Sequence, residues 1–276
     1  MQNVGIEQLK LDWRYLAFDV APERLRSAIE GAKAMKFIGL NLTVPHKLLA
    51  MPMVDVLDES AASWGAVNTI RFEMRVGDDW KPLREVGADF GGEIRSHGFN
   101  TDADAIARAL HEDLGLELES ARVLLLGAGG AGRVAALKLA ASNVSALWLV
   151  NRTTERVEAL AAEIRQRYPN VTVSEGYPTG EVDLILNATS LGLGENDASP
   201  IDEEKFPLNR SKRVYDMIYR PAMTPLLKRA HAAGCRTANG LGMLLYQGAK
   251  ALEIWSGQTA PVATMKEALR KNLYGA

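Results

Sequence analysis

Short runs of hydrophobic residues alternate along this chain with longer segments whose apolar residues recur at helical spacing. The segments Arg122–Leu126, Ala146–Val150 and Asp183–Asn187 are mostly apolar, as strands buried on both faces of a parallel sheet are. Strands that alternate with helices in this way predict an α/β fold.

The N-terminal part of the chain predicts one α/β unit. We expect the polar, glycine-bearing segment Arg75–Gly92 to form a long hairpin or loop within it. The remaining elements follow from periodicity and from Pro22, which opens a helix. They are helices at Met1–Leu9, Pro22–Ala34 and Asp55–Trp64, and strands at Trp13–Val20, Phe37–Thr43, Ala66–Phe72 and Ile94–Asn100.

The rest of the chain predicts a second sheet with helices between its strands. The boundary falls near a helix that begins at Thr101 or Asp102 and ends near Leu114. The expected strands are Arg122–Leu126, Ala146–Val150, Val171–Ser174, Asp183–Asn187, Val214–Asp216 and Arg236–Ala238. The expected helices are Ala131–Ser142, Thr154–Tyr168, Gly240–Trp255 and Val262–Leu273.

Composition narrows the class of protein. A net charge of −2 without long basic or acidic runs argues against nucleic acid or an anionic membrane as a partner. The single cysteine, Cys235, excludes an intrachain disulfide and fits a reducing cytoplasm. No apolar run is long enough for a membrane span, and Met1–Lys10 lacks the pattern of a signal peptide. The four histidines show no metal-ligand spacing, so no metal site is expected.

The most specific local signal is the sequence Gly127-Ala128-Gly129-Gly130-Ala131-Gly132. It places glycines in a G-x-G-x-x-G pattern after an apolar strand and before an alanine-rich helix, which is the context of a dinucleotide-binding loop. The first glycine permits a tight turn, the second lets the backbone approach a pyrophosphate, and the third lets helix and strand pack closely. The alternative is a structural turn without a ligand.

The end of the next strand indicates which dinucleotide is bound. Proteins that select NAD place an acidic residue there to bind the ribose hydroxyls, whereas this strand ends in Asn151-Arg152-Thr153-Thr154-Glu155-Arg156. Arg152 can stack on adenine and pair with a 2′-phosphate, and Arg156 lies one helical turn further on. The sequence therefore predicts NADP, unless both arginines are ordinary solvated residues.

Two further clusters contain candidate chemistry. In Asn41-Leu42-Thr43-Val44-Pro45-His46-Lys47, the lysine lies at a helix start, where the helix dipole disfavours a cation and so suits the residue to proton transfer. By spacing alone, a solvated lysine is the more common explanation. Asn100-Thr101-Asp102 reads first as a helix cap, although its carboxylate could also pair with Lys47.

These segments, taken together and in order, resemble the shikimate dehydrogenase family. The resemblance covers nearly the whole chain. Besides the glycine loop, it rests on segments 41–47, 65–69, 100–102, 151–153, 187–192, 215–221 and 239–244, with Gln247 just beyond.

The resemblance implies a substrate and catalytic domain of residues 1–102 plus 240–276 and a Rossmann domain of residues 103–239. It implies NADP-dependent, reversible reduction of 3-dehydroshikimate to shikimate, on the route to chorismate and aromatic amino acids, by a cytoplasmic monomer or homodimer. Lys47 and Asp102 are the implied catalytic pair. The implied substrate contacts are Thr43, Asn68, Asp102, Tyr219 and Gln247. The implied cofactor contacts are Glu59, Gly127, Ala128, Gly129, Gly130, Ala131, Asn151, Arg152, Thr153, Arg156, Met217 and Gly240.

This chain departs from the family pattern in ways that leave its substrate open. Family members normally begin with a strand and a His-Ser-Leu-Ser-Pro segment whose serines contact the substrate carboxylate, whereas this sequence starts just after that point. If that start is genuine, the sheet loses a strand and substrate affinity should fall. The segment Arg75–Gly92 looks longer than the family's usual hairpin, and Ala103-Asp104-Ala105 stands where glycines are common. A quinate/shikimate dehydrogenase of broader specificity and a catalytically weak NADP-binding regulatory relative are the alternatives.

Overall fold

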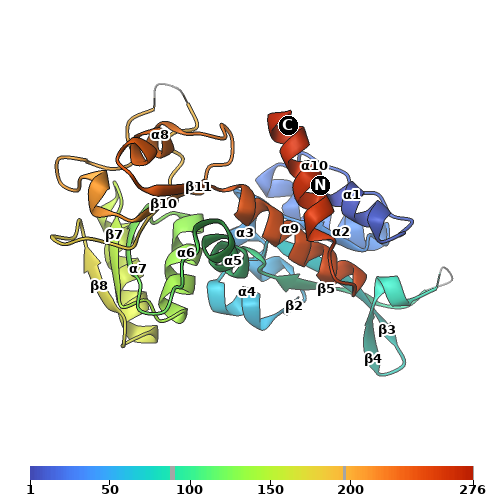
Figure 1. Cartoon of the computed structure of the whole chain (residues 1–276). Coiled ribbons are helices and arrows are strands. Elements are labelled where there is room, and N and C mark those ends of the chain that lie inside the picture. The colour runs from blue at the N-terminus through green and yellow to red at the C-terminus, as the bar shows by residue number, and fades with distance from the viewer. Residues whose placement is uncertain (88–90, 195–196, 276) are drawn as a thin grey trace. The chain divides into compact units, whose positions relative to one another are not determined.

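The structure is a computed structural model that describes residues 1–87, 91–194 and 197–275. Its chain forms two compact units, the first of residues Met1–Asp102 with Gln247–Ala276 and the second of Ala103–Tyr246 (Figure 1). The return to the first unit falls at Gln247, inside a helix, whereas the sequence analysis placed it at 240. None of the helices in the described part of the chain combines the length and hydrophobicity needed to span a bilayer.

The first unit is built on a mixed sheet. Its strand order is β1-β3-β5-β2, and β4 pairs with β3 in a hairpin. β2 and β5 run parallel, and the other pairs are antiparallel. The hairpin confirms the first half of the expectation for Arg75–Gly92, and residues 88–90 of that segment lie outside the described residues. The strands are β1 (Gly39–Asn41), β2 (Val56–Leu57), β3 (Thr69–Val76), β4 (Asp79–Pro82) and β5 (Ile94–Phe99).

Trp13–Val20 is not a strand, so that prediction was wrong. A strand needs a hydrogen-bonded neighbour, and this extended segment is held mainly by side chains instead. The Asn3 amide group bonds the backbone N–H and C=O of Tyr15, at 2.7 and 3.0 Å. Leu16 and Phe18 are 65% and 62% exposed, so the apolar pattern that suggested a buried strand does not reflect burial here.

A buried core lies between helix α2 and the sheet of the first unit. Leu25, Ile29 and Ala32 of α2 pack with Ile70 and Phe72 of β3. The predicted helix Asp55–Trp64 begins later than expected, because Val56–Leu57 pairs with β5 and Asp58 then caps the helix by accepting the Ser60 N–H. The elements are α1 (Gln2–Gln8), η1 (Pro22–Arg24), α2 (Leu25–Ala34), α3 (His46–Leu49), η2 (Met51–Met53), α4 (Glu59–Trp64), η3 (Leu83–Glu85), α9 (Leu241–Ser256, shared with the second unit) and α10 (Val262–Tyr274).

The second unit contains a six-stranded parallel sheet of order β11-β10-β9-β6-β7-β8. The chain runs outward from β6 through β7 to β8, then crosses to the other side of β6 and continues through β9 and β10 to β11. The carboxyl ends of β6 and β9 therefore flank the point where the order reverses, which is where doubly wound sheets bind ligands. The strands are β6 (Arg122–Leu126), β7 (Ala146–Val150), β8 (Thr172–Glu175), β9 (Leu184–Asn187), β10 (Arg213–Asp216) and β11 (Arg236–Asn239).

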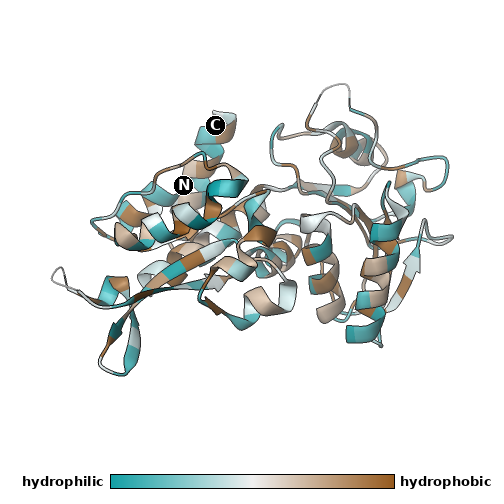
Figure 2. Ribbon diagram, turned by 180° about the vertical axis from the view of Figure 1, so that it is seen from behind, coloured by the Kyte–Doolittle hydropathy of each residue, from teal (hydrophilic) through white to brown (hydrophobic). Residues whose placement is uncertain are grey.

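Helices between these strands carry both hydrophilic and hydrophobic residues, as Figure 2 shows. α7 has a buried and an exposed side, whereas α6 is buried along most of its length. One of them, α8, is absent from the sequence prediction although its start signal is present. Thr224 accepts the Leu227 N–H as the cap, and Pro225 follows at the first helical position. The helices are α5 (Asp102–Leu114), α6 (Gly130–Ala141), α7 (Thr154–Arg167) and α8 (Pro225–Ala232), with the short η4 (Leu208–Arg210).

Candidate active site

Lys47 and Asp102 lie together in the first unit. Lys47 is in α3, directly after β1 and its turn, and Asp102 begins α5 directly after β5. The Lys47 Nζ lies 2.8 Å from Asp102 Oδ2, and the two side chains are 27% and 8% exposed. The Val67 N–H donates to the Lys47 carbonyl at 2.9 Å, which ties α3 to the segment before β3. The pair thus combines a partly accessible amine with a nearly buried carboxylate that orients it.

Asn68 is the centre of a buried hydrogen-bond network next to this pair. Its Oδ1 accepts the Thr101 N–H at 2.9 Å and the Thr69 hydroxyl at 3.1 Å, and its Nδ2 donates to Thr101 Oγ1 at 3.0 Å. Asp102 follows Thr101 in the chain, so the network fixes the backbone from which the carboxylate projects. Asn68 itself is almost fully buried.

Asn41 extends this network, and sequence reasoning did not single out its side chain. Its Nδ2 donates to Thr69 Oγ1 at 3.0 Å and to the Asn68 carbonyl at 3.2 Å. Its Oδ1 accepts the Tyr15 hydroxyl at 3.0 Å, and burial raises the pKa of Tyr15 above its ordinary value, so this hydroxyl keeps its proton. The sequence does contain a signal for this network, the adjacent polar pair Asn68-Thr69. Thr69 lies opposite Asn41 in the sheet.

The other predicted residues of the first unit are more scattered. Thr43 is exposed in the turn before α3, and its carbonyl accepts the His46 N–H at 2.8 Å. Glu59 is exposed at the start of α4, and Gln247 is half-buried in α9. Their predicted roles as substrate or cofactor contacts stay predictions.

In the second unit, the glycine loop has the backbone geometry that its pattern predicts. Gly127 has a φ of +105°, and its N–H donates to the Val150 carbonyl at 2.7 Å. A Cβ on Gly132 would lie 2.1 Å from the Gly127 carbonyl oxygen, so only glycine fits there. By contrast, Gly129 and Gly130 face open space. The loop therefore leaves room for a phosphate group at the N-terminus of α6, and these residues fit a dinucleotide.

Asn151 connects this loop to the end of β7. Its Oδ1 accepts the Ala128 N–H at 3.1 Å, and its Nδ2 donates to the Thr153 carbonyl at 3.0 Å. Arg152 and Arg156 are both exposed, and α7 begins at Thr154, after Thr153. Two cations and a helix N-terminus thus stand beside the glycine loop, an arrangement suited to an anionic group.

Met217 and Gly240 pack against each other after β10 and β11. A Cβ on Gly240 would lie 2.0 Å from the Met217 carbonyl oxygen, which requires glycine there. The Gly240 N–H donates to the Ile218 carbonyl at 3.1 Å, and Tyr219 is exposed just beyond. The turn after β9 lies against the glycine loop, because Ala188 and Thr189 are near Gly127. Both residues belong to segment 187–192, which contributes to the family resemblance, but neither was predicted as a site residue.

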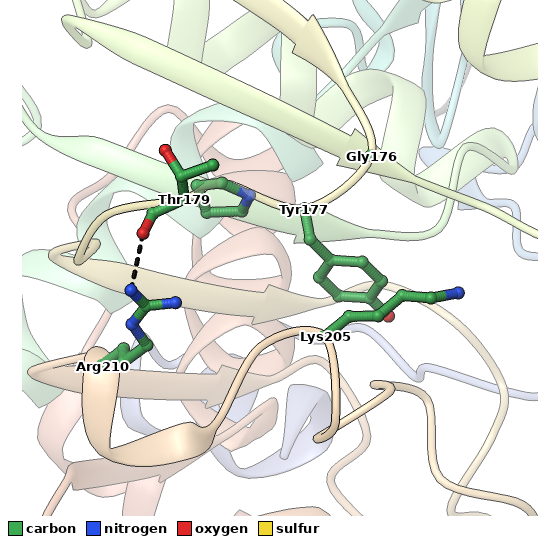
Figure 3. Close-up of a pocket in the computed structure, with 6 residues that line it drawn as sticks. Gly176, Tyr177, Thr179, Lys205 and Arg210 are labelled. Carbon is green, nitrogen blue, oxygen red and sulfur yellow. Dashed lines mark hydrogen bonds between the residues drawn. The ribbon is translucent and has the colours of Figure 1, made fainter.

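A surface hollow elsewhere in the second unit does not contain any predicted site residue. Tyr177, Lys205 and Arg210 line it together with Gly176, Pro178 and Thr179 (Figure 3). Its cations are engaged, since Arg210 donates to the Thr179 carbonyl at 2.6 Å and Lys205 pairs with Asp202 at 3.2 Å. In the described residues, no three His, Cys, Asp or Glu side chains are arranged to hold a metal ion.

Three family models match the chain. Residues 1–70 match the shikimate dehydrogenase substrate binding domain, residues 108–192 match shikimate / quinate 5-dehydrogenase, and residues 240–270 match the shikimate 5′-dehydrogenase C-terminal domain. A relative from Methanopyrus kandleri, shikimate dehydrogenase (NADP(+)), is 37% identical over 99% of this chain and 90% of its own length.

Solved structures agree with these matches. Shikimate 5-dehydrogenase from Thermus thermophilus, in complex with NADP(H) and shikimate, has a TM-score of 0.80 and 34% identity over 98% of this chain and 92% of its own. A ligand-free 5-ketofructose reductase of Gluconobacter has a TM-score of 0.79 and 33% identity over 98% of this chain and 92% of its own. The same fold and a similar level of identity therefore occur with more than one named activity.

Proposed function

The chain belongs to the shikimate dehydrogenase family, and we propose that it catalyses the NADP-dependent, reversible reduction of 3-dehydroshikimate to shikimate. The observation that carries this proposal is the 2.8 Å contact between Lys47 and Asp102, because a ketone reduction needs a positioned proton donor beside the carbonyl oxygen. The matching relative from Methanopyrus kandleri is named for this reaction.

The two residues of the pair have different roles in the proposed reaction. In the reductive direction, the Lys47 ammonium donates a proton to the ketone oxygen as a hydride reaches the carbon, which yields the ring alcohol. In the oxidative direction, the lysine amine accepts the hydroxyl proton as the hydride leaves. Asp102 holds the amine in place and, as a substrate contact, accepts a hydrogen bond from a ring hydroxyl. Thr43, Asn68, Tyr219 and Gln247 contact the remaining hydroxyls and the carboxylate.

NADP, when bound, supplies or accepts the hydride. The glycine loop, from Gly127 to Ala131, would hold its pyrophosphate through backbone N–H groups and the N-terminus of α6. Arg152 and Arg156 would pair with the 2′-phosphate, while Asn151 and Thr153 would hold the adenosine end. Met217, Gly240 and Glu59 would hold the nicotinamide end. The support for this assignment is the open space at Gly129 and Gly130 and the two exposed arginines beside them.

Quinate is the alternative substrate, because one of the matching family models is named shikimate / quinate 5-dehydrogenase. The similar structure from Gluconobacter is named 5-ketofructose reductase, so 5-ketofructose is a further ketone to test as a substrate. We further propose that the enzyme acts in the reducing cytoplasm, because the lone Cys235 is a buried free thiol whose pKa is raised by burial, as suits an unreactive cysteine. We also propose that it acts as a monomer or homodimer, as the family resemblance implies.

Steady-state assays of the full gene product test the proposal. NADPH or NADH formation is measured with shikimate or quinate as the alcohol, in all four combinations, and the reverse reaction is measured with 5-ketofructose. The proposal predicts the highest kcat/KM for shikimate with NADP. Comparable rates with quinate would favour the broader enzyme. Cofactor binding without turnover of any of these substrates would favour a regulatory protein and contradict the proposal.

A further inference from the structure

Asp216 is a fully buried carboxylate whose hydrogen-bond partners are all neutral. It ends β10 and has no exposed surface. Its Oδ2 accepts the Thr224 hydroxyl at 2.6 Å, and its Oδ1 accepts the Asn187 amide at 3.0 Å and the Ile218 N–H at 3.1 Å. This buried acid at a strand end therefore accepts hydrogen bonds from two segments, the end of β9 and the segment that follows β10.

Such a group is costly for stability. Burial disfavours an ionised carboxylate unless a cation compensates, and burial raises the pKa of Asp216 despite its three hydrogen bonds. An apolar residue would fill the same volume without that cost. The three hydrogen bonds that the carboxyl group accepts, rather than its burial, therefore indicate what it does at this strand end.

The partners of Asp216 connect the turns at the carboxyl edge of the sheet. Asn187 ends β9, and its Oδ1 accepts the Thr189 N–H and hydroxyl at 3.0 and 2.8 Å. Thr189 in turn lies against Gly127, where a Cβ would be 3.0 Å from Thr189 Cγ2. On the other side, Ile218 and Thr224 fix the segment that begins with Met217 and leads to α8.

We propose that Asp216 is a positioning residue that fixes the turns after β9 and β10 against the glycine loop and so shapes the seat of the nicotinamide end of the cofactor. This inference rests on the proposed function, because it assumes that a dinucleotide lies across these strand ends. The adenosine end is expected beside β7, at Arg152, on the opposite side of β6. Loss of Asp216 should therefore affect one half of the cofactor and spare the other.

The test is Asp216→Asn, which keeps the side-chain volume and replaces one acceptor oxygen with a donor. Three quantities are measured for the variant and the parent enzyme. They are the affinity for 2′,5′-ADP, which contains only the adenosine end, the affinity for NADPH, and the fluorescence of the nicotinamide in bound NADPH. We expect 2′,5′-ADP affinity to change by less than about twofold, as for independent sites. The turnover number should fall by roughly tenfold to a hundredfold, the loss typical of a small misplacement of reacting groups, and the nicotinamide fluorescence should change.

Asp183→Asn is the matched control. Asp183 precedes the other end of β9 and binds Arg122 and Lys212, so the same substitution there should lower stability and leave the nicotinamide signal unchanged. Asp216→Asn behaving like Asp183→Asn would overturn the inference, and so would an equal loss of 2′,5′-ADP and NADPH binding. If Asp216→Asn does not fold, Thr224→Val, which removes one partner of the carboxylate, is read by the same criteria.

The cofactor readouts also separate this inference from the proposed function. A parent enzyme that binds NADPH but does not oxidise shikimate would refute the proposed reaction. The comparison of NADPH fluorescence with 2′,5′-ADP affinity would still decide whether Asp216 positions the nicotinamide.

Discussion

The ammonium of Lys47 lies 2.8 Å from a carboxylate oxygen of Asp102, although 55 positions separate the two residues in the chain. The contact exists because β1 and β5 both pair with β3 and direct their following segments to the same end of the mixed sheet. A short helix and a long helix then begin there, each supplying one member of the pair.

Replacing Lys47 by alanine should reduce the turnover number by roughly two to four orders of magnitude, as for loss of a general acid–base group. NADP affinity, measured by titration, should be unchanged, because the glycine loop belongs to the other unit. Lys33→Ala is a suitable control, since Lys33 also pairs with a carboxylate, Asp55, in the first unit. A Lys47→Ala enzyme with a normal turnover number at saturating substrate would contradict the proton-transfer role.

Two glycine substitutions should separate cofactor binding from folding. Gly129 faces open space, so Gly129→Ala should fold normally and weaken NADP binding by roughly tenfold or more, because the added methyl group blocks a backbone–phosphate hydrogen bond. Gly132→Ala should instead lower the free energy of unfolding by about 1–3 kcal/mol through overpacking against the Gly127 carbonyl. Thermal melts and NADP titrations check both. Unchanged NADP affinity in Gly129→Ala would argue against a bound pyrophosphate.

Arg152→Ala should weaken NADP binding by roughly tenfold to a hundredfold, the range for a charge-assisted hydrogen bond, and leave NAD binding nearly unchanged. The guanidinium is exposed at the end of β7 and therefore available to a 2′-phosphate. Arg165→Ala, in the last turn of α7, serves as the control because Arg165 pairs with Glu175. Equal losses of NADP and NAD affinity would refute the phosphate contact.

Glu73 should contribute stability that depends on pH. Burial alone would raise the pKa of Glu73, but hydrogen bonds from His97, Arg71 and Arg95 lower it to about 2, below its ordinary value of 4.5. A carboxylate whose pKa is lower in the folded state contributes its stability above the unfolded value, and loses it as pH falls through the folded value. The contribution is therefore complete above about pH 4.5 and lost towards pH 2.

Glu73→Gln tests this dependence. The substitution should lower the free energy of unfolding at pH 7 by roughly 1–3 kcal/mol, because it leaves partly buried cations without a charged partner. The difference from the parent protein should shrink between pH 4.5 and pH 2 in urea titrations. Glu93→Gln, which removes an exposed carboxylate at 3.9 Å from Arg75, should have little effect at any pH. A difference that stays constant over this pH range would show that the carboxylate's charge is not responsible.

Much of the second unit could be predicted from the sequence, because its central strands β6 and β9 are buried along most of their length and are mostly apolar. β6 and β7 have the predicted bounds, and β9 differs by one residue. The first unit was harder: Trp13–Val20 has the residues of a strand but no strand partner, and Val56–Leu57 becomes a strand only through its pairing with β5.

The candidate site shows the same division. The glycine loop could be identified from spacing and context, since its chemistry is local. The residues alone favoured a solvated lysine at position 47 and a helix cap at position 102, with a contact between the two as the alternative. The family resemblance then made that contact the expectation. The half-buried Asn41 and the buried Asp216 belong to segments that contribute to the family resemblance, but neither was assigned a role. A polar residue at a strand end is common, and only its three-dimensional partners distinguish it.

The most direct test of the proposed reaction follows the transferred hydrogen itself. The full gene product is incubated with NADP and with shikimate that carries deuterium on the carbon to be oxidised, and the resulting NADPH is analysed by mass spectrometry. The account predicts NADPH that contains one deuterium on its nicotinamide ring, and a rate that falls by orders of magnitude in Lys47→Ala. NADPH without deuterium, or bound NADP that is never reduced, would contradict the account.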